Sequence, residues 1–138
     1  MPEKTALVLI DIYNDFLHPD GKATGALSAS LTEANTIVHL QEVLAAARAA
    51  KIPVFYSLHQ QYYEGKYTGF EHWNPMLRSV QSSHSFEEGS FGAQIFKGLE
   101  PDPANGDVVI SKHWNQVGRH SESWRCVELT SPVPELFQ

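Results

Sequence analysis

A run of five apolar residues near the N-terminus ends directly in a carboxylate, and this feature constrains the fold more than any other. Residues 6–10 read ALVLI, and Asp11 follows them. A short unbroken apolar run predicts a strand buried on both faces, as in a parallel sheet. A charge at the end of such a strand is costly unless another group pairs with it. The rest of the sequence therefore has to supply a partner for Asp11.

The segment after this strand predicts a β-α-β unit. Residues 17–29 are rich in turn-forming residues and are expected to form a loop. Ser30 and Glu33 have the spacing of a capping box, and apolar residues then recur at helical spacing, which predicts a helix over residues 31–50. The sequence VFYSL at 54–58 predicts a second strand. A strand, a crossover helix and a strand give a parallel pair with a right-handed connection.

A third strand is predicted at 107–111, where the sequence reads DVVIS. The connection that precedes it, residues 59–106, is long, and connections of this length are typically functional or only partly ordered. Within it a short helix is predicted near residues 75–81. The connection also holds an aromatic cluster, which either lines a pocket for a planar substrate or packs locally. This cluster consists of Tyr62, Tyr63, Tyr67, Phe70 and Trp73.

Three polar residues follow the three predicted strands. Asp11 ends the first strand, His59 follows the second and Lys112 follows the third. Ligands of open parallel sheets bind outside the carboxyl ends of the strands, where we expect these side chains to converge. A nearby ammonium group on Lys112 would keep Asp11 ionised. Two interpretations stay open, because the pair could belong to a reactive site or could be an ion pair that seals the sheet.

Composition and charge exclude several classes of function. The chain has 138 residues, the size of one ordinary domain, and a formal net charge of −6 without a cluster of Lys and Arg. Nucleic acids and anionic membranes are therefore poor candidates for partners. No apolar run is long enough to span a bilayer, and the N-terminus lacks the features of a signal peptide. A single cysteine excludes an internal disulfide, and a cytoplasmic location is expected.

Three segments resemble the isochorismatase-like cysteine hydrolases, a family that includes isochorismatases, nicotinamidases and N-carbamoylsarcosine amidases. ALVLIDIYNDFLHPDGK is similar to the N-terminal motif of that family. PVFYSLHQQYYEGKYTGFEHWNPM resembles its second strand and lid region, and GDVVISKHWNQ resembles its third strand with the catalytic lysine. The resemblance covers most of residues 5–116.

This resemblance implies an α/β fold, a Rossmann-like three-layer αβα arrangement with a parallel sheet in the order 3-2-1-4-5-6. Strands 1 to 3 are expected in this chain. It also implies hydrolysis of an amide C–N bond or a vinyl ether in a small molecule by an Asp-Lys-Cys site. Asp11 would take the thiol proton, and Lys112 would favour the thiolate. A cysteine at a helix N-terminus after strand four would attack the carbonyl.

The chain departs from this family pattern in its C-terminal part. Residues 1–116 are expected to be a partial hydrolase domain, truncated or divergent at its C-terminal side, and residues 117–138 an irregular tail. Cys126 follows SESWR rather than an apolar strand and is not assigned the nucleophile's role. The expected catalytic residues are therefore Asp11 and Lys112 alone, and we expect the chain to be inactive.

No metal and no cofactor are expected. Nicotinamidases of the family bind a metal through an Asp-x-His pair and a later histidine, but Ser57 stands here in place of that aspartate, with His59 and His72 remaining. The competing interpretation is a non-catalytic binding or interaction protein built on the same half-sheet. Its first strand would be an open edge, which predicts self-association. A phosphotransfer function fits poorly, because the chain has no phosphate-binding glycine loop.

Overall fold

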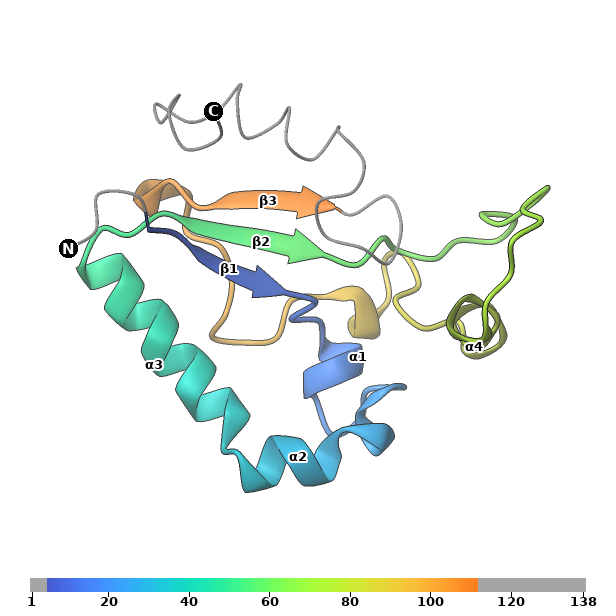
Figure 1. The fold of residues 1–138 in the computed structure, drawn as a ribbon, viewed down its shortest axis with the longest axis horizontal. Coiled ribbons are helices and arrows are strands. Elements are labelled where there is room, and N and C mark those ends of the chain that lie inside the picture. Colours follow the sequence, from blue (N-terminus) through green and yellow to red (C-terminus); the bar gives the residue numbers. More distant parts are fainter. Residues whose placement is uncertain (1–4, 112–138) are drawn as a thin grey trace. The chain divides into compact units, whose positions relative to one another are not determined.

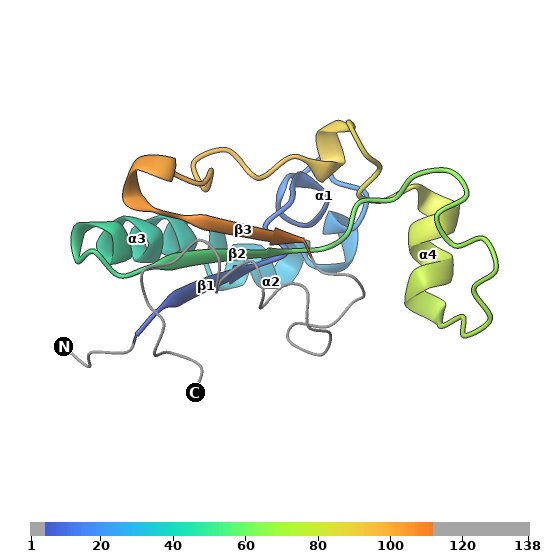
Figure 2. The same cartoon turned by 90° about the horizontal axis from the view of Figure 1, so that it is seen from above.

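Three strands form one open parallel sheet in the computed structural model, which describes residues 5–111 (Figure 1). They are β1 (Leu7–Ile10), β2 (Val54–Leu58) and β3 (Val108–Ser111). The strand order is β1-β2-β3 and both pairings are parallel, so the three arrows point the same way (Figure 2). The predicted strands, their direction and the edge position of the first strand are confirmed. The prediction that the first strand is buried on both faces is wrong, because Leu9 is the one buried residue of β1, whereas Val8 and Ile10 are exposed.

The chain divides into two compact units by its internal contacts. The first unit contains the sheet and includes the described residues 5–11, 41–60 and 101–111. The second unit consists of residues 12–40 and 61–100. The predicted tail, residues 117–138, lies outside the described residues.

The core of the first unit surrounds β2. All five residues of β2 are buried, because β1 and β3 flank this strand on both sides. Leu9 of β1 is paired with Tyr56 of β2 and shares its face of the sheet. Tyr56 contacts Arg48 of the helix α3 (Thr36–Ala49), so this is the face on which α3 lies. Burial of apolar side chains on this face is the main stabilising contribution to the unit.

The predicted single helix over residues 31–50 is wrong in one respect, because the structure contains two helices there. Helix α2 (Ser28–Glu33) ends before Asn35, which has a φ of +48°, and α3 begins at the next residue. Asparagine adopts the left-handed region more readily than most residues, so the break falls at this position. The predicted capping box is also wrong, since Ser30 lies inside α2 and Glu33 is its last residue.

The second unit is built from short helices. The predicted loop at 17–29 contains the 3-10 turn η1 (Thr24–Ala26) and the start of α2, and it is preceded by the single-turn helix α1 (Asn14–Leu17). Turns this short leave almost no periodic pattern in a sequence, which is why they were not predicted. A further 3-10 turn, η2 (Phe91–Ala93), precedes residue 95, which bridges to Tyr13.

Helix α4 (Pro75–Ser83) confirms the short helix predicted near residues 75–81. The side chain of Asn74 accepts the N–H of Leu77 at 2.9 Å, and Pro75 occupies the first helical position, where its missing N–H is not needed. The helix ends at His84, whose φ is +51°. Its boundaries are thus set by local sequence.

Candidate functional site

Asp11 is the residue at which the chain leaves β1. Its N–H donates to the carbonyl oxygen of Ser57 in β2 at 3.1 Å, and its side chain is half-buried. Its φ is +56°, a left-handed conformation that is uncommon for a residue with a side chain. Strain of this kind concentrates at functional sites. Asn35, Lys51, His84 and Phe86 share this conformation, so the φ alone does not mark a site. What distinguishes Asp11 is its place at the carboxyl end of the sheet, where ligands of open parallel sheets bind.

Lys112, the predicted partner of Asp11, lies outside the described residues, as do His113 and Cys126. The residue before Lys112 is Ser111, the last residue of β3. Because β2 separates β1 from β3, the ends of the two outer strands are two strand spacings apart, about 10 Å. A lysine side chain would therefore have to cross the end of β2 to reach Asp11, and this convergence stays a prediction.

His59 occupies the same end of the sheet, one residue after β2. The residue is 1% exposed, and its Nδ1 lies 2.7 Å from the carbonyl oxygen of Gln60. A carbonyl can only accept, so Nδ1 carries the proton of this hydrogen bond. This contact fits the interpretation of His59 as a hydrogen-bonded loop residue. Ser57, which stands where a metal-binding aspartate would be, is 5% exposed within β2.

His72 is exposed and lies edge-on to the ring of Phe70, with 6.2 Å between the ring centroids. Within residues 5–111 there is no group of three His, Cys, Asp or Glu side chains placed to bind a metal ion.

Asp15 is an important residue that the sequence analysis missed. This carboxylate is 1% exposed. It accepts the N–H of Lys22 at 2.9 Å and the N–H of Phe86 at 2.6 Å. Hydrogen bonds from backbone N–H groups stabilise a buried carboxylate in place of water. Asp15 therefore joins three segments of the second unit, since Gly92 also packs directly against its side chain.

No signal in the sequence identifies the partners of Asp15. Phe86 is 71 residues away along the chain, and it adopts a φ of +56° that its sequence does not predict. The nearest hint is the DIYND sequence itself, in which a second aspartate follows Asp11 by four residues. Asp15 is a structural residue in this geometry, because both carboxylate oxygens bind backbone groups.

Four residues of the aromatic cluster pack against one another, whereas the fifth, Tyr63, is 50% exposed. The ring centroids of Tyr62 and Tyr67 are 6.1 Å apart, and those of Tyr67 and Trp73 are 5.4 Å apart. Trp73 also contacts Phe70 at 6.0 Å. Separations of this size are typical of stabilising aromatic pairs. Because Tyr62 and Tyr67 are also buried, the observed contacts support local packing rather than a pocket for a planar substrate.

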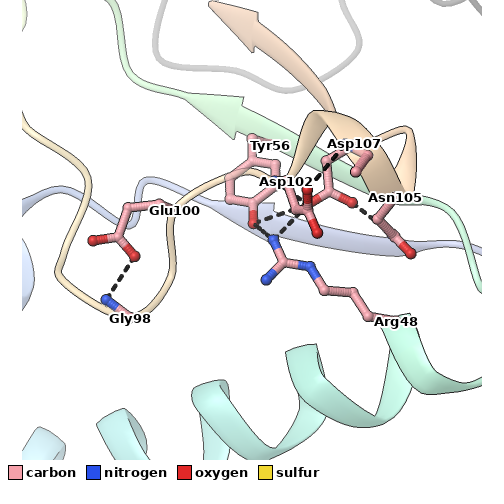
Figure 3. A network of polar contacts seen from close by, with 8 residues as sticks. Arg48, Tyr56, Gly98, Glu100, Asp102, Asn105 and Asp107 are labelled. Carbon is pink, nitrogen blue, oxygen red and sulfur yellow. Dashed lines mark hydrogen bonds and ion pairs between the residues drawn. The ribbon is translucent and has the colours of Figure 1, made fainter.

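A polar network lies at the opposite end of the sheet, where the strands begin (Figure 3). The guanidinium of Arg48 donates to Tyr56 Oη at 3.0 Å and to Asp107 Oδ2 at 2.5 Å. The side chain of Asp107 has no solvent-exposed surface, whereas that of Arg48 is 25% exposed. The N–H of Asp102 and the amide of Asn105 also donate to the Asp107 carboxylate.

These contacts fix the charge state of the network. Burial of Asp107 opposes its ionised form, but the N–H of Asp102 and the side chains of Arg48 and Asn105 outweigh that effect and hold its pKa below the ordinary value. Burial also acts against the charge of Arg48, yet its hydrogen bond to Asp107 raises the pKa of the guanidinium. This pair joins α3 to β2 and β3, and its location away from the carboxyl ends indicates a structural role.

One groove in the second unit has the volume of a small-molecule site, about 700 Å³. Its walls include Leu17, Leu31 and Phe96, and none of the residues that line it is charged. The groove consequently offers no acid, base or thiolate for hydrolysis.

Comparison with known proteins identifies the chain's relatives by sequence and by fold. A sequence model described as the isochorismatase domain matches residues 5–119. A cysteine hydrolase from Pseudomonas syringae pv. phaseolicola 1448A superposes with a TM-score of 0.52 and 20% identity, over 79% of this chain and 46% of its own. No match was found among curated proteins.

The N-carbamoylsarcosine amidase from Thermoplasma acidophilum superposes with a TM-score of 0.56 and 19% identity, over 90% of this chain and 60% of its own. At such identities the two structures establish the fold alone. The chain thus spans less than two thirds of either structure. In the part of the chain that the structure describes, no helix has the length and hydropathy needed to cross a membrane.

Proposed function

The chain belongs to the isochorismatase domain family, and from this premise we propose that it carries part of a hydrolase site in which Asp11 is the proton acceptor. The substrate class is a small molecule with an amide C–N bond or a vinyl ether. The observation that supports the proposal best is the half-buried position of Asp11 at the carboxyl end of the parallel sheet.

In this proposal Asp11 and Lys112 have different roles in activating the thiol. The carboxylate of Asp11 takes the proton of a nucleophilic thiol, and the ammonium of Lys112 stabilises the resulting thiolate. With an amide substrate the thiolate attacks the carbonyl, and Asp11 returns the proton to the leaving amine. Water then cleaves the resulting thioester, which releases the acid and restores the thiol. A carboxylate serves this purpose only if it stays ionised before the reaction, which a neighbouring ammonium group favours.

The nucleophile is the component that this polypeptide does not visibly supply. Cys126 is the one cysteine of the sequence, and the residues before it, SESWR, lack the apolar sequence of a strand that would lead into an activating helix N-terminus. We therefore propose that the 138-residue polypeptide is inactive by itself.

We expect the purified 138-residue chain to show no measurable turnover of amide, ureido or isochorismatase-type substrates. Loss of a nucleophile removes orders of magnitude in rate, because the members of a catalytic set act as a unit. The measurement compares the wild-type chain with Cys126→Ala and Asp11→Asn. Turnover abolished by Cys126→Ala would show that the C-terminal segment supplies the nucleophile. Turnover lost only in Asp11→Asn would place another nucleophile beside Asp11, and turnover unaffected by either variant would refute the proposal.

The alternative function is a non-catalytic interaction protein, and the edge of β1 is the observation that favours it. Leu7 and Asp11 donate their N–H groups to the β2 side, so the backbone groups of Val8 and Ile10 point to the opposite edge. The side chains of Val8 and Ile10 are 47% and 51% exposed. Among the described strands β1 pairs with β2 alone, and no charge or proline interrupts its edge.

We expect this edge to make the chain self-associate. The Ile10→Lys variant should shift the population towards monomer, because a lysine on an edge strand disfavours pairing with another chain. Size-exclusion chromatography with light scattering over a concentration series measures the shift. Val43→Lys is the matched control, since Val43 is 50% exposed on α3 and outside the strand. A wild-type chain that is monomeric at every concentration would contradict the prediction.

A further inference from the structure

The turn that leads into β3 contains an asparagine followed by a glycine. The 3-10 turn η3 (Pro103–Asn105) ends at Gly106, which has a φ of +79°. In an Asn-Gly sequence the glycine nitrogen can attack the asparagine side-chain carbonyl with little hindrance, because glycine has no side chain and few conformational restrictions. The product of this attack is a five-membered succinimide ring.

Both reacting groups donate hydrogen bonds to other residues in the folded turn. The amide Nδ2 of Asn105 donates to Asp107 Oδ1 at 2.7 Å. The N–H of Gly106 donates to the carbonyl oxygen of Pro103 at 3.1 Å. Ring closure requires the glycine nitrogen to leave Pro103 and the side-chain amide to leave Asp107. The reaction can therefore proceed only when this turn opens locally.

We propose that Asn105 is a site of spontaneous deamidation and that it does not react while the hydrogen bonds of η3 are intact. The Gly106 nitrogen forms a bond to Cγ of Asn105, and ammonia leaves with the side-chain nitrogen. Water then opens the succinimide at either of its two carbonyl carbons, which gives aspartate or isoaspartate. The net change is the gain of one water and the loss of one ammonia, and the neutral amide becomes a carboxylic acid that is ionised at neutral pH.

The product cannot restore the original contact. A carboxylate at position 105 would face the Asp107 carboxylate at the distance at which the amide now donates to it. Two ionised carboxylates this close repel one another, and neither can donate a hydrogen bond. Asp107 is the group that Arg48 and the N–H of Asp102 also bind (Figure 3). Deamidation therefore occurs after the turn has opened locally, and its product weakens the hydrogen-bond network around Asp107 that stabilises the turn.

The first experiment follows the mass of the peptide Gly98–Lys112, obtained by proteolysis after incubation of the full chain at mildly alkaline pH. In urea this peptide is expected to gain about one dalton, the difference between an amide and a carboxylic acid, and to split into aspartate and isoaspartate forms. In native buffer the gain should be slower. The peptide that carries Asn35, which precedes Thr36, is the internal comparison. No gain in urea, or equal rates in urea and native buffer, would overturn the proposal.

Two sets of variants test whether the hydrogen bond to Asp107 slows deamidation and whether the product destabilises the turn. Asp107→Ala removes the acceptor of the Asn105 amide, so the rate of deamidation in native buffer should rise towards the rate in urea. An unchanged rate would refute the protection of Asn105 by this hydrogen bond. Asn105→Asp reproduces the product, whereas Asn105→Ser removes the hydrogen bond to Asp107 without adding a charge. Asn105→Asp should have the lower urea midpoint, and the difference should shrink at high salt. Equal midpoints for the two variants at low salt would contradict the repulsion.

Discussion

Replacement of Arg48 by methionine is expected to lower the free energy of unfolding by about 3 to 5 kcal/mol, because the change leaves the Asp107 carboxylate buried without its cation. The carboxylate has no solvent-exposed surface and would keep neutral donors alone, the N–H of Asp102, the amide of Asn105 and a long hydrogen bond from Tyr56 Oη at 3.5 Å. Methionine has a similar unbranched stem, so the loss reflects the charge and its hydrogen bonds more than packing. Urea unfolding followed by circular dichroism measures the effect.

Two further variants isolate the origin of this loss. Arg78→Met removes an arginine that is exposed and lies over the ring of Trp73 at 5.6 Å, and it should cost about 1 kcal/mol or less. Arg48→Lys keeps the charge but not the planar guanidinium that binds Tyr56 and Asp107 together. Its loss in free energy of unfolding should lie between those of Arg48→Met and Arg78→Met. A loss for Arg48→Met no larger than that for Arg78→Met would refute the role of the pair.

The same pair predicts how stability depends on pH. The pKa of Asp107 is lower in the folded chain than its ordinary value of 3.8, so the unfolded chain binds the proton more readily. The stability that Asp107 contributes is therefore complete above about pH 4 and is lost as the pH falls through the lowered folded pKa. In Arg48→Met the carboxylate lacks its cation, and this part of the acid-induced loss should be smaller.

Gly92→Ala is expected to destabilise the second unit by roughly 3 kcal/mol, since an added methyl group in a filled site forces its neighbours apart. A Cβ at this position would lie only 2.4 Å from Oδ2 of Asp15 and still closer to Oδ1. The carboxylate cannot move aside without breaking its bonds to the N–H groups of Lys22 and Phe86. A buried N–H group left without a partner costs about 1 to 3 kcal/mol.

Gly25→Ala provides the matched control for this prediction. Nothing lies within 4 Å of a Cβ at Gly25, so the variant should change the stability by less than about 0.5 kcal/mol. A double-mutant cycle with Asp15→Ala tests the cause, because the truncated side chain leaves room for the new methyl group. The effects of Gly92→Ala and Asp15→Ala should then be less than additive. Strict additivity would mean that the two positions do not clash.

The sequence determined the elements whose signals are local. An unbroken apolar run specified β1, and the β-α-β pattern specified parallel pairing, because a crossover helix leaves few other connections. Asn74 and Pro75 specified the start of α4, since capping acts within a few residues. The position of Asp11 at the end of this strand could also be predicted, although the burial of the strand on both faces was not borne out. The groups around that carboxylate could not be predicted with the same certainty from local sequence, because the proposed partner, Lys112, is about 100 residues away along the chain.

Only the tertiary structure decided which distant residues meet. Arg48 and Asp107 are separated by 59 residues, and Asp15 and Phe86 by 71. Neither pair has a spacing that a helix or strand imposes, so periodicity carries no information about them. The left-handed conformation of Asp11 and the break at Asn35 likewise depend on the direction that the following segment takes in the folded chain. Local propensity differs by only about 1 kcal/mol between conformations, and packing of the whole chain outweighs it.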